Sequence, residues 1–127
     1  MSIPAGIGAS HAAAEAGSTR IAFRLRLSGM KVLADISIVP LGAGVSLSPY
    51  VAACERVLRD AGLAPRLHAF GTNVEGEWDA VLGAVRRCHE VVHAMGAPRV
   101  HSAMKLSTRV DRDHSLGDKV RSVEEKL

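Results

Sequence analysis

The sequence predicts a single α+β domain in which helices cover one face of an antiparallel sheet. Two kinds of pattern lead to this prediction: period-two alternation marks strands, and apolar residues at helical spacing mark helices between and after them. The elements follow in the order strand, helix, strand, strand, helix, strand, helix. With 127 residues, 47% of them hydrophobic, the chain is long enough for one core.

The first strand and the first helix have clear local signals. Side chains alternate from Lys31 to Val39, and Pro40 is expected to end the strand. A glycine-containing loop leads to Ser48, the expected N-cap of a helix with Pro49 at its first position. The buried stripe of this helix, which stops at Gly62, is predicted to contain Val51, Cys54, Val57, Leu58 and Ala61.

A tight reversal between two short strands leads into the second helix. The chain alternates from Arg66, breaks at Gly71 and resumes with Thr72. A helix is predicted from about Glu77 to Met95, before Gly96. Its apolar face is expected to contain Trp78, Val81, Leu82, Val85, Cys88 and Val92.

The last strand is predicted from Arg99 to Thr108, and a short helix follows it. Ser115 and Asp118 have the spacing of a capping box, and Leu116, Val120, Val123 and Leu127 form one helical stripe. The complete order is that of a ferredoxin-like βαββαβ sandwich with an antiparallel sheet, plus a C-terminal helix.

Such a sandwich leaves one face of its sheet without helices. The side chains expected to point to the helices are Ala34, Ile36, Ile38, Leu67, Ala69, Val100 and Met104. The opposite face then contains Asp35, Ser37, His68, Phe70, His101, Ala103 and Lys105, beside Leu33 and Val39. This mixture suits a solvated surface, an oligomer interface or the floor of a pocket, and its apolar members favour an interface with a pocket.

Composition argues against several partners and compartments. Only 3% of the residues are aromatic and the net charge is +3, so a stacking platform or basic stripe for nucleic acid is not expected. No apolar run approaches the roughly 20 residues that span a bilayer, so no membrane partner is expected. Cys54 and Cys88 lie on predicted apolar helix faces and are expected to be buried free thiols, which indicates a reducing cytoplasm.

The N-terminal residues differ from the rest of the chain. Residues 1–29 are predicted to be a disordered extension, because the first 19 are mainly small residues that bury little apolar surface, and residues 30–127 form the domain. A start codon assigned upstream of Met30 would produce the same tail, and an Arg-bearing, acid-poor extension is weakly similar to a transit peptide. Residues 21–27 alternate as a short edge strand does.

A metal site is not expected, although His89-Glu-Val-Val-His93 matches the HExxH zinc-protease pattern. Helical periodicity places His89 about 40° from the centre of the apolar stripe, inside it, and His93 about 80° away at its edge, while Glu90 faces solvent. The nearest third ligand, His101, is expected on the opposite face of the sheet, so the set does not suit a zinc site. We expect His89 to bond to backbone and His93 to be solvated. The loop before Ser48 lacks the Lys-Ser/Thr of a P-loop, and no catalytic constellation is predicted.

Four segments together resemble the small thiamine-binding-protein family. They are Met30-Lys-Val-Leu-Ala-Asp-Ile-Ser-Ile-Val-Pro-Leu-Gly, His68-Ala-Phe-Gly-Thr-Asn-Val-Glu-Gly-Glu-Trp78, Met95-Gly-Ala-Pro-Arg-Val and Val123-Glu-Glu-Lys-Leu. The resemblance extends over residues 30–127. It implies a ferredoxin-like protein that forms homodimers or homotetramers and binds thiamine or its hydroxymethylpyrimidine precursor without catalysis and without a cofactor.

The reversal and the uncovered face provide a candidate site for such a ligand. An aminopyrimidine both donates and accepts hydrogen bonds, as do Ser37, Thr72 and Asn73, and Asp35 or Glu75 would offset the charge of a thiazolium. The candidate ligand-binding residues are Asp35, Ser37, His68, Thr72, Asn73, Glu75 and Lys105. The alternative is structural: Thr72 and Asn73 satisfy the turn, and Glu75 caps the next helix.

Two function classes follow from the sequence. The first is non-catalytic binding of thiamine or hydroxymethylpyrimidine at a pocket on the uncovered sheet face, near an oligomer interface. The second is a self-associating interaction or regulatory domain with no specific ligand.

Overall fold

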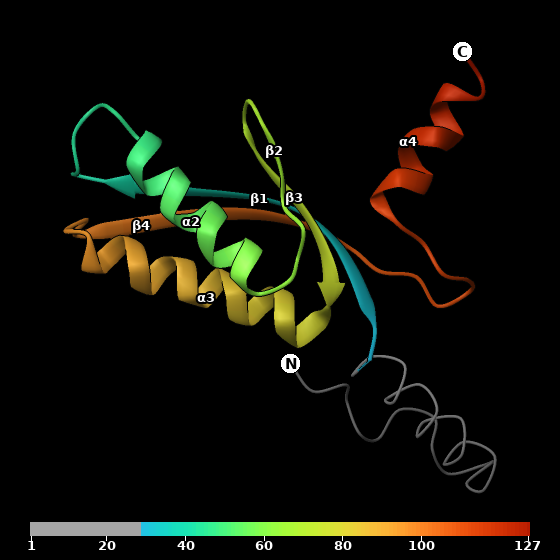
Figure 1. Cartoon of the computed structure of the whole chain (residues 1–127), viewed down its shortest axis with the longest axis horizontal. Coiled ribbons are helices and arrows are strands. Elements are labelled where there is room, and N and C mark those ends of the chain that lie inside the picture. The colour runs from blue at the N-terminus through green and yellow to red at the C-terminus, as the bar shows by residue number, and fades with distance from the viewer. Residues whose placement is uncertain (1–28) are drawn as a thin grey trace, which may run out of the picture.

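The computed structural model describes residues 29–127, so the expectations for the N-terminal extension and for a strand at residues 21–27 lie outside the described part. Within that part the predicted order of elements is confirmed: β1 (Lys31–Leu41), α2 (Ser48–Asp60), β2 (Arg66–His68), β3 (Gly71–Glu77), α3 (Trp78–Ala94), β4 (Arg99–Ser107) and α4 (Leu116–Glu124). Helices α2 and α3 lie on the same side of the sheet, and α4 lies beyond one end of it (Figure 1).

The sheet has the strand order β2-β3-β1-β4, and all neighbours pair antiparallel. This is the ferredoxin-like arrangement that the sequence predicts. Pairing between β1 and β3 ends where Ile36 faces Thr72, whereas β4 follows β1 as far as Leu41. The second half of β1 therefore has a neighbour on one side only.

Pro40 does not end β1, contrary to expectation, because it lies in this half of the strand. It is paired with Val100 of β4, and within residues 29–127 no strand pairs with it on the other side. A proline, which lacks the amide hydrogen, is tolerated where a strand forms an edge.

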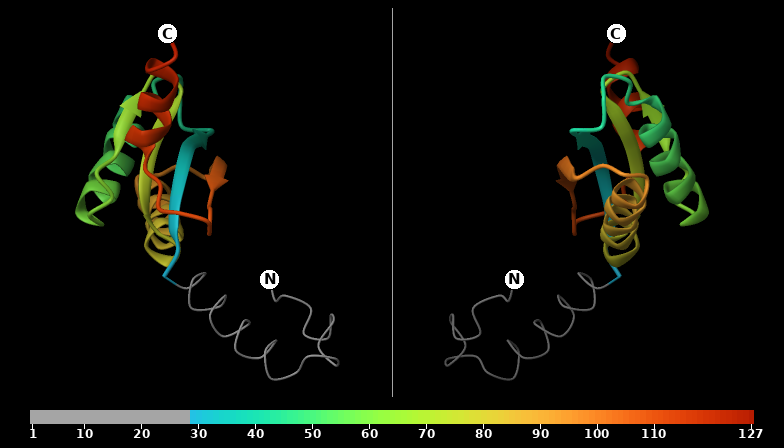
Figure 2. Two further views of the ribbon diagram at one scale, coloured as in Figure 1. Left: turned by 90° about the vertical axis from the view of Figure 1, so that its right-hand side faces the viewer. Right: turned by 90° about the vertical axis from the view of Figure 1, so that its left-hand side faces the viewer.

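The core lies between the sheet and the two long helices, as the side views show (Figure 2). β1 contributes Val32, Ala34 and Ile36, which alternate along the strand as predicted. The remaining buried members are Cys54, Leu58, Leu63, Val74, Val81, Ala84, Val85, Cys88, Val92 and Ala97. The helix stripes predicted from spacing are largely the ones that pack.

The helix caps differ in part from the prediction. Ser48 is the first residue of α2, and its N-cap is Leu47, which makes no side-chain cap hydrogen bond. Glu77 caps α3, with Oε2 accepting the amides of Asp79 at 2.9 Å and Ala80 at 3.1 Å. Ser115 caps α4 as predicted, with Oγ accepting the Asp118 amide at 3.0 Å.

At the edges of the sheet the predicted directions do not always lead to burial. Leu67 is aligned with Thr72 and points to the helix side as predicted, but it is 62% exposed, and Ala69 is also exposed. Met104 is aligned with Ile36 but is 38% exposed. Leu33, expected on an open face, is only 3% exposed.

The segment before α4 explains the burial of Leu33. His114, itself buried, donates from Nε2 to the Lys31 carbonyl at 3.2 Å. The Leu116 amide donates to Glu75 at 3.2 Å, and Glu75 is the pairing partner of Leu33. The start of α4 is therefore tied to β1 and β3 on either side of Leu33.

Among residues 29–127, no helix combines the length and the apolar character needed to cross a membrane.

Candidate functional site

A polar network on the uncovered face joins three neighbouring strands. Asp35 of β1 faces Asn73 of β3, and His68 of β2 lies beside them. Asp35 Oδ1 accepts from His68 Nε2 at 2.7 Å and from Asn73 Nδ2 at 3.4 Å. The register of the hairpin thus brings together three of the seven predicted site residues.

The hydrogen bonds of His68 indicate its protonation state. The Phe70 amide donates to Nδ1 at 3.3 Å, so this nitrogen is an acceptor and carries no proton. The proton therefore lies on Nε2 and is donated to Asp35. With these two hydrogen bonds the imidazole closes the turn and orients the carboxylate.

Thr72 lies on the other face of the sheet, away from this network. Its hydroxyl donates to Glu55 Oε2 of α2 at 2.8 Å, and both residues are buried. Adjacent strand residues point to opposite faces, so Thr72 and Asn73 cannot contribute to the same face. In residues 29–127, Thr72 is the one hydrogen-bond partner found for the Glu55 carboxylate.

Glu55 was not predicted as a site residue. It lies in the apolar stripe of α2, four residues after Val51 and three before Leu58. A carboxylate at such a position is almost never fully buried without a partner, and this was the signal that could have identified it.

A cavity of about 290 Å³ lies between the unpaired edge of β1, the buried face of α2 and the β2–β3 turn. The cavity occupies the space beside β1 beyond the last β1–β3 pair, Ile36 and Thr72. Its walls are mainly apolar, and its polar groups include Ser37, Glu55, His68 and Thr72. The cavity is therefore at the edge of the sheet rather than on the uncovered face where we expected a pocket.

The seven predicted residues divide into three groups. Ser37, His68 and Thr72 line the cavity. Asp35 bonds to His68 at the cavity wall, and Asn73 bonds to Asp35. Glu75 and Lys105 are not among its lining residues.

Glu75 holds the chain before α4 and does not cap α3. It pairs with Lys31 Nζ at 3.2 Å and accepts the Leu116 amide. Lys105 lies opposite Asp35 on β4 and is exposed. These positions give Glu75 a structural role and leave Lys105 on the uncovered face.

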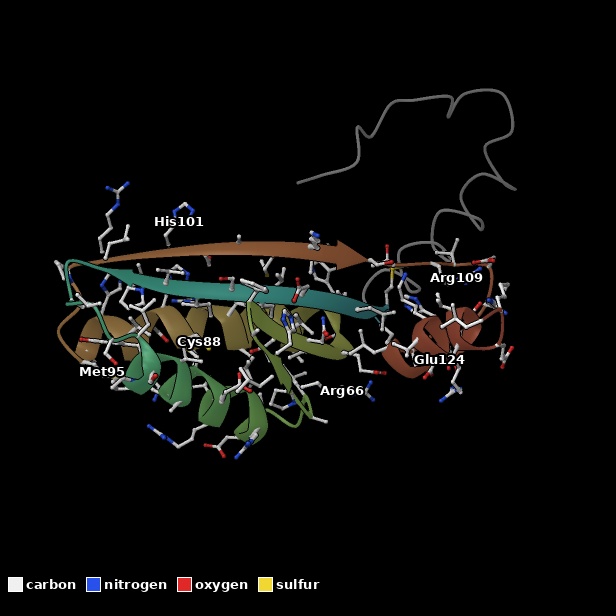
Figure 3. All side chains as sticks on the ribbon, turned by 90° about the horizontal axis from the view of Figure 1, so that it is seen from above. Arg66, Cys88, Met95, His101, Arg109 and Glu124 are labelled. Carbon is white, nitrogen blue, oxygen red and sulfur yellow. The ribbon has the colours of Figure 1, made fainter. Side chains whose placement is uncertain are left out.

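Both histidines of the HExxH helix make hydrogen bonds inside the domain. His89 bonds to the Ser102 hydroxyl at 2.9 Å rather than to backbone, because Ser102 is on the side of β4 that faces α3. His93 is exposed and donates to the Ala97 carbonyl at 2.9 Å. His101 points away from the helices (Figure 3), and residues 29–127 contain no group of three potential metal ligands.

Comparison with known proteins identifies the family. The family model described as thiamine-binding protein matches residues 34–124. The chain belongs to the thiamine-binding protein family. A UPF0045 protein of Synechocystis is 54% identical over 99 residues, covering 78% of this chain and 82% of that protein. A UPF0045 protein of Eremothecium gossypii is 41% identical, covering 80% and 97%.

Solved structures of similar proteins have the same fold. A hypothetical protein from Methanocaldococcus jannaschii is 35% identical with a TM-score of 0.70, and the match covers 75% of this chain and 97% of that one. A Thermotoga maritima protein at 18% identity has a TM-score of 0.63 over 73% of this chain and 98% of its own. The ferredoxin-like fold of the family member described here is therefore the one already seen in solved relatives.

Proposed function

We propose that this chain binds thiamine or a related aminopyrimidine such as hydroxymethylpyrimidine, without catalysis, in the cavity at the edge of the sheet. The observation that carries the proposal is the buried Glu55 carboxylate, which has a hydroxyl partner in Thr72 and faces apolar walls. A buried carboxylate is unfavourable unless it is paired, so a cationic or donor-rich ligand stabilises it. The family to which the chain belongs supports the same ligand class.

The chemistry of an aminopyrimidine matches these groups. Its exocyclic amine donates, and a ring nitrogen that carries a proton donates beside it, so one carboxylate can accept from both. Leu47, Val51 and Leu67 line the same cavity and would contact the faces of the ring. A volume of about 290 Å³ is at the lower end of the roughly 300–1,000 Å³ typical of ligand sites, which suits a single ring.

The thiazolium of thiamine would extend towards the β2–β3 turn. Phe70 lines the cavity there and is 89% exposed, and an aromatic face attracts a cation at short range. Asp35 lies behind His68 and adds negative charge on the same side. In this arrangement Glu55 recognises the pyrimidine, and the turn recognises the cationic ring.

This proposal revises the role of several predicted residues. Ser37, His68 and Thr72 are proposed contacts, and Asp35 and Asn73 are proposed to hold His68 in place. Glu75 is assigned to the docking of α4.

A thermal-shift series on the full chain tests the proposal. Thiamine, thiamine monophosphate and hydroxymethylpyrimidine are added at rising concentration, with pyrimidine-free thiazole alcohol as the control. At a hundredfold excess over the dissociation constant a ligand stabilises the fold by ~2.7 kcal/mol. If none of the three raises the melting temperature and calorimetry detects no heat, the binding proposal is wrong.

The second candidate is self-association without a specific ligand. The observation that favours it is exposed apolar surface away from the cavity walls: Val120 is 57% and Val123 is 60% exposed on α4. Homodimers or homotetramers would cover such surface. Sedimentation of the ligand-free chain across a dilution series measures this, and a monomer at all concentrations would rule it out.

A further inference from the structure

Two cysteines lie close together where the helices α2 and α3 pack on the sheet. Cys54 of α2 and Cys88 of α3 are free, and they are 6% and 0% exposed. The Cys88 thiol donates to the Cys54 carbonyl at 3.8 Å. Cys88 lies on the helix side of the sheet, in the layer between α2 and α3 (Figure 3). The ligand-binding proposal gives these thiols no role.

The two sulfurs differ in their access to solvent. Cys54 lines the cavity at the edge of the sheet, whereas Cys88 does not. A small solute that enters the cavity therefore meets Cys54 first and reaches Cys88 only through it. Burial normally makes a cysteine inert, and the cavity removes that protection from one thiol of the pair.

The two thiols also differ in acidity. A hydrogen bond between the two thiol side chains, distinct from the one to the Cys54 carbonyl, lowers the pKa of Cys54, although burial and the nearby Glu55 oppose this. The same hydrogen bond, together with burial, raises the pKa of Cys88. The thiolate therefore forms on the sulfur at the cavity wall, and its neighbour stays protonated.

We propose that Cys54 and Cys88 form a redox-active dithiol, in which a hydroperoxide enters through the cavity, oxidises Cys54, and a disulfide to Cys88 follows. The Cys54 thiolate attacks one peroxide oxygen, the O–O bond breaks, and the leaving oxygen takes a proton to become water or an alcohol. Cys54 is then a sulfenic acid. The Cys88 sulfur attacks the Cys54 sulfur, the S–O bond breaks, and the Cys88 proton leaves with the hydroxyl group as water. The two thiols have then supplied the two electrons that reduced the peroxide, and two equivalents of a small thiol reductant convert the disulfide back to two thiols by exchange.

Disulfide formation changes the cavity wall. The sulfurs approach to about 2.05 Å, which turns the Cys54 side chain towards α3 and away from the cavity. Glu55, the next residue, accepts a hydrogen bond at Oε2 from Thr72 Oγ1 at 2.8 Å, and a shift of α2 would alter that distance. This consequence for binding rests on the proposed function, whereas the oxidation chemistry does not.

The test is titration of the reduced full chain with hydrogen peroxide, followed by intact mass and peptide mapping. The expected product is a single chain that has lost two hydrogens and has no free thiol, and its digest should contain the Cys54 and Cys88 peptides joined by a disulfide. Three results would overturn the proposal: thiols that stay free until the chain is denatured, a disulfide between two chains, or oxygen added to Cys54 with no link.

Single variants assign the order of the steps. Cys88→Ala should leave Cys54 to accumulate one and then two oxygens, because no thiol resolves the sulfenic acid. Cys54→Ala should leave Cys88 unreacted at the same peroxide concentration. Rapid oxidation of Cys88 in Cys54→Ala would refute access through the cavity. If an alanine variant does not fold, the conservative Cys88→Ser and Cys54→Ser replace it.

Repeating the oxidation in the presence of thiamine distinguishes failure of this proposal from failure of the proposed function. At a hundredfold excess over its dissociation constant, thiamine in the cavity should slow disulfide formation roughly a hundredfold. A disulfide that forms at the same rate with and without thiamine, in a chain that thiamine stabilises, would overturn access of peroxide through the cavity. A disulfide that forms in a chain that thiamine does not stabilise would sustain the dithiol and refute the thiamine site.

Discussion

The sharpest prediction concerns the charge of Glu55. Glu55→Gln keeps the size of the side chain and leaves an oxygen to accept from Thr72, which now donates at 2.8 Å. It removes the negative charge and one acceptor oxygen from the cavity. The change therefore separates recognition of a cationic pyrimidine from simple filling of space.

The magnitude follows from the hydrogen bond that is lost. A hydrogen bond to a charged group contributes roughly 1.5–3 kcal/mol, and each 1.4 kcal/mol is tenfold in affinity. We expect Glu55→Gln to weaken thiamine binding by about tenfold to a hundredfold. The ligand-free fold should keep its stability or gain some, because a buried charge that has a neutral hydroxyl as its partner has been removed.

Calorimetric titration with thiamine and thermal melting of the ligand-free variant measure the two effects. Glu125→Gln is the matched control, since this carboxylate is exposed and lies just beyond α4, outside the cavity lining. Unchanged affinity in Glu55→Gln would refute the reasoning. So would a ligand-free melting temperature that falls by ten degrees or more, roughly the effect of a 2 kcal/mol loss in a domain of this size, because Glu55 would then be a structural residue.

Three further predictions concern the hairpin, α4 and the acid limit of stability. Gly71→Ala would bring a Cβ within 2.7 Å of a β1 carbonyl oxygen, so it should destabilise the fold by about 1–3 kcal/mol in a urea titration and weaken ligand binding. Glu75→Gln should increase amide hydrogen exchange at the start of α4 while leaving thiamine affinity unchanged, because Glu75 accepts an amide there and does not line the cavity. The Arg109 guanidinium holds the pKa of exposed Asp111 at about 2, below the ordinary 3.8. The stabilisation of the folded state by Asp111 is therefore present above about pH 3.8 and is lost as the pH falls to about 2. Because Asp111 is exposed, this contribution is small, so Asp111→Asn should lower the melting temperature only slightly at pH 7 and should flatten its pH dependence between about pH 4 and 2 by the same small amount.

Much of the fold could be predicted because hydrophobic periodicity is a local property. Val32, Ala34 and Ile36 alternate, and the structure buries all three. The errors lie where a long-range contact decides the outcome. Pro40 continues β1 because β4 pairs with it, and Leu67 is exposed because β2 is short and α2 does not cover it.

The candidate site was predicted less completely, for a related reason. Because side chains alternate along a strand, Thr72 and Asn73 must face opposite sides of the sheet. Only the register with β1 determines which side each of them faces. Asn73 joins Asp35 on the uncovered face, and Thr72 joins Glu55 in the helix layer. The partnership with α2 depends on packing across the domain, which residue spacing does not specify.

The cavity and the buried carboxylate have one structural origin. Because β3 pairs with β1 only as far as Ile36, the five residues from Ser37 to Leu41 are left without a neighbour on that side. The same gap opens the cavity beside the part of α2 where Glu55 lies. A longer hairpin would close the gap and bury Glu55 against backbone, where a carboxylate is most unfavourable. The proposed ligand would fill this space and pair with the charge, so the proposed function accounts for both the short hairpin and the charged residue in an apolar stripe, and violations of local rules are expected at functional sites.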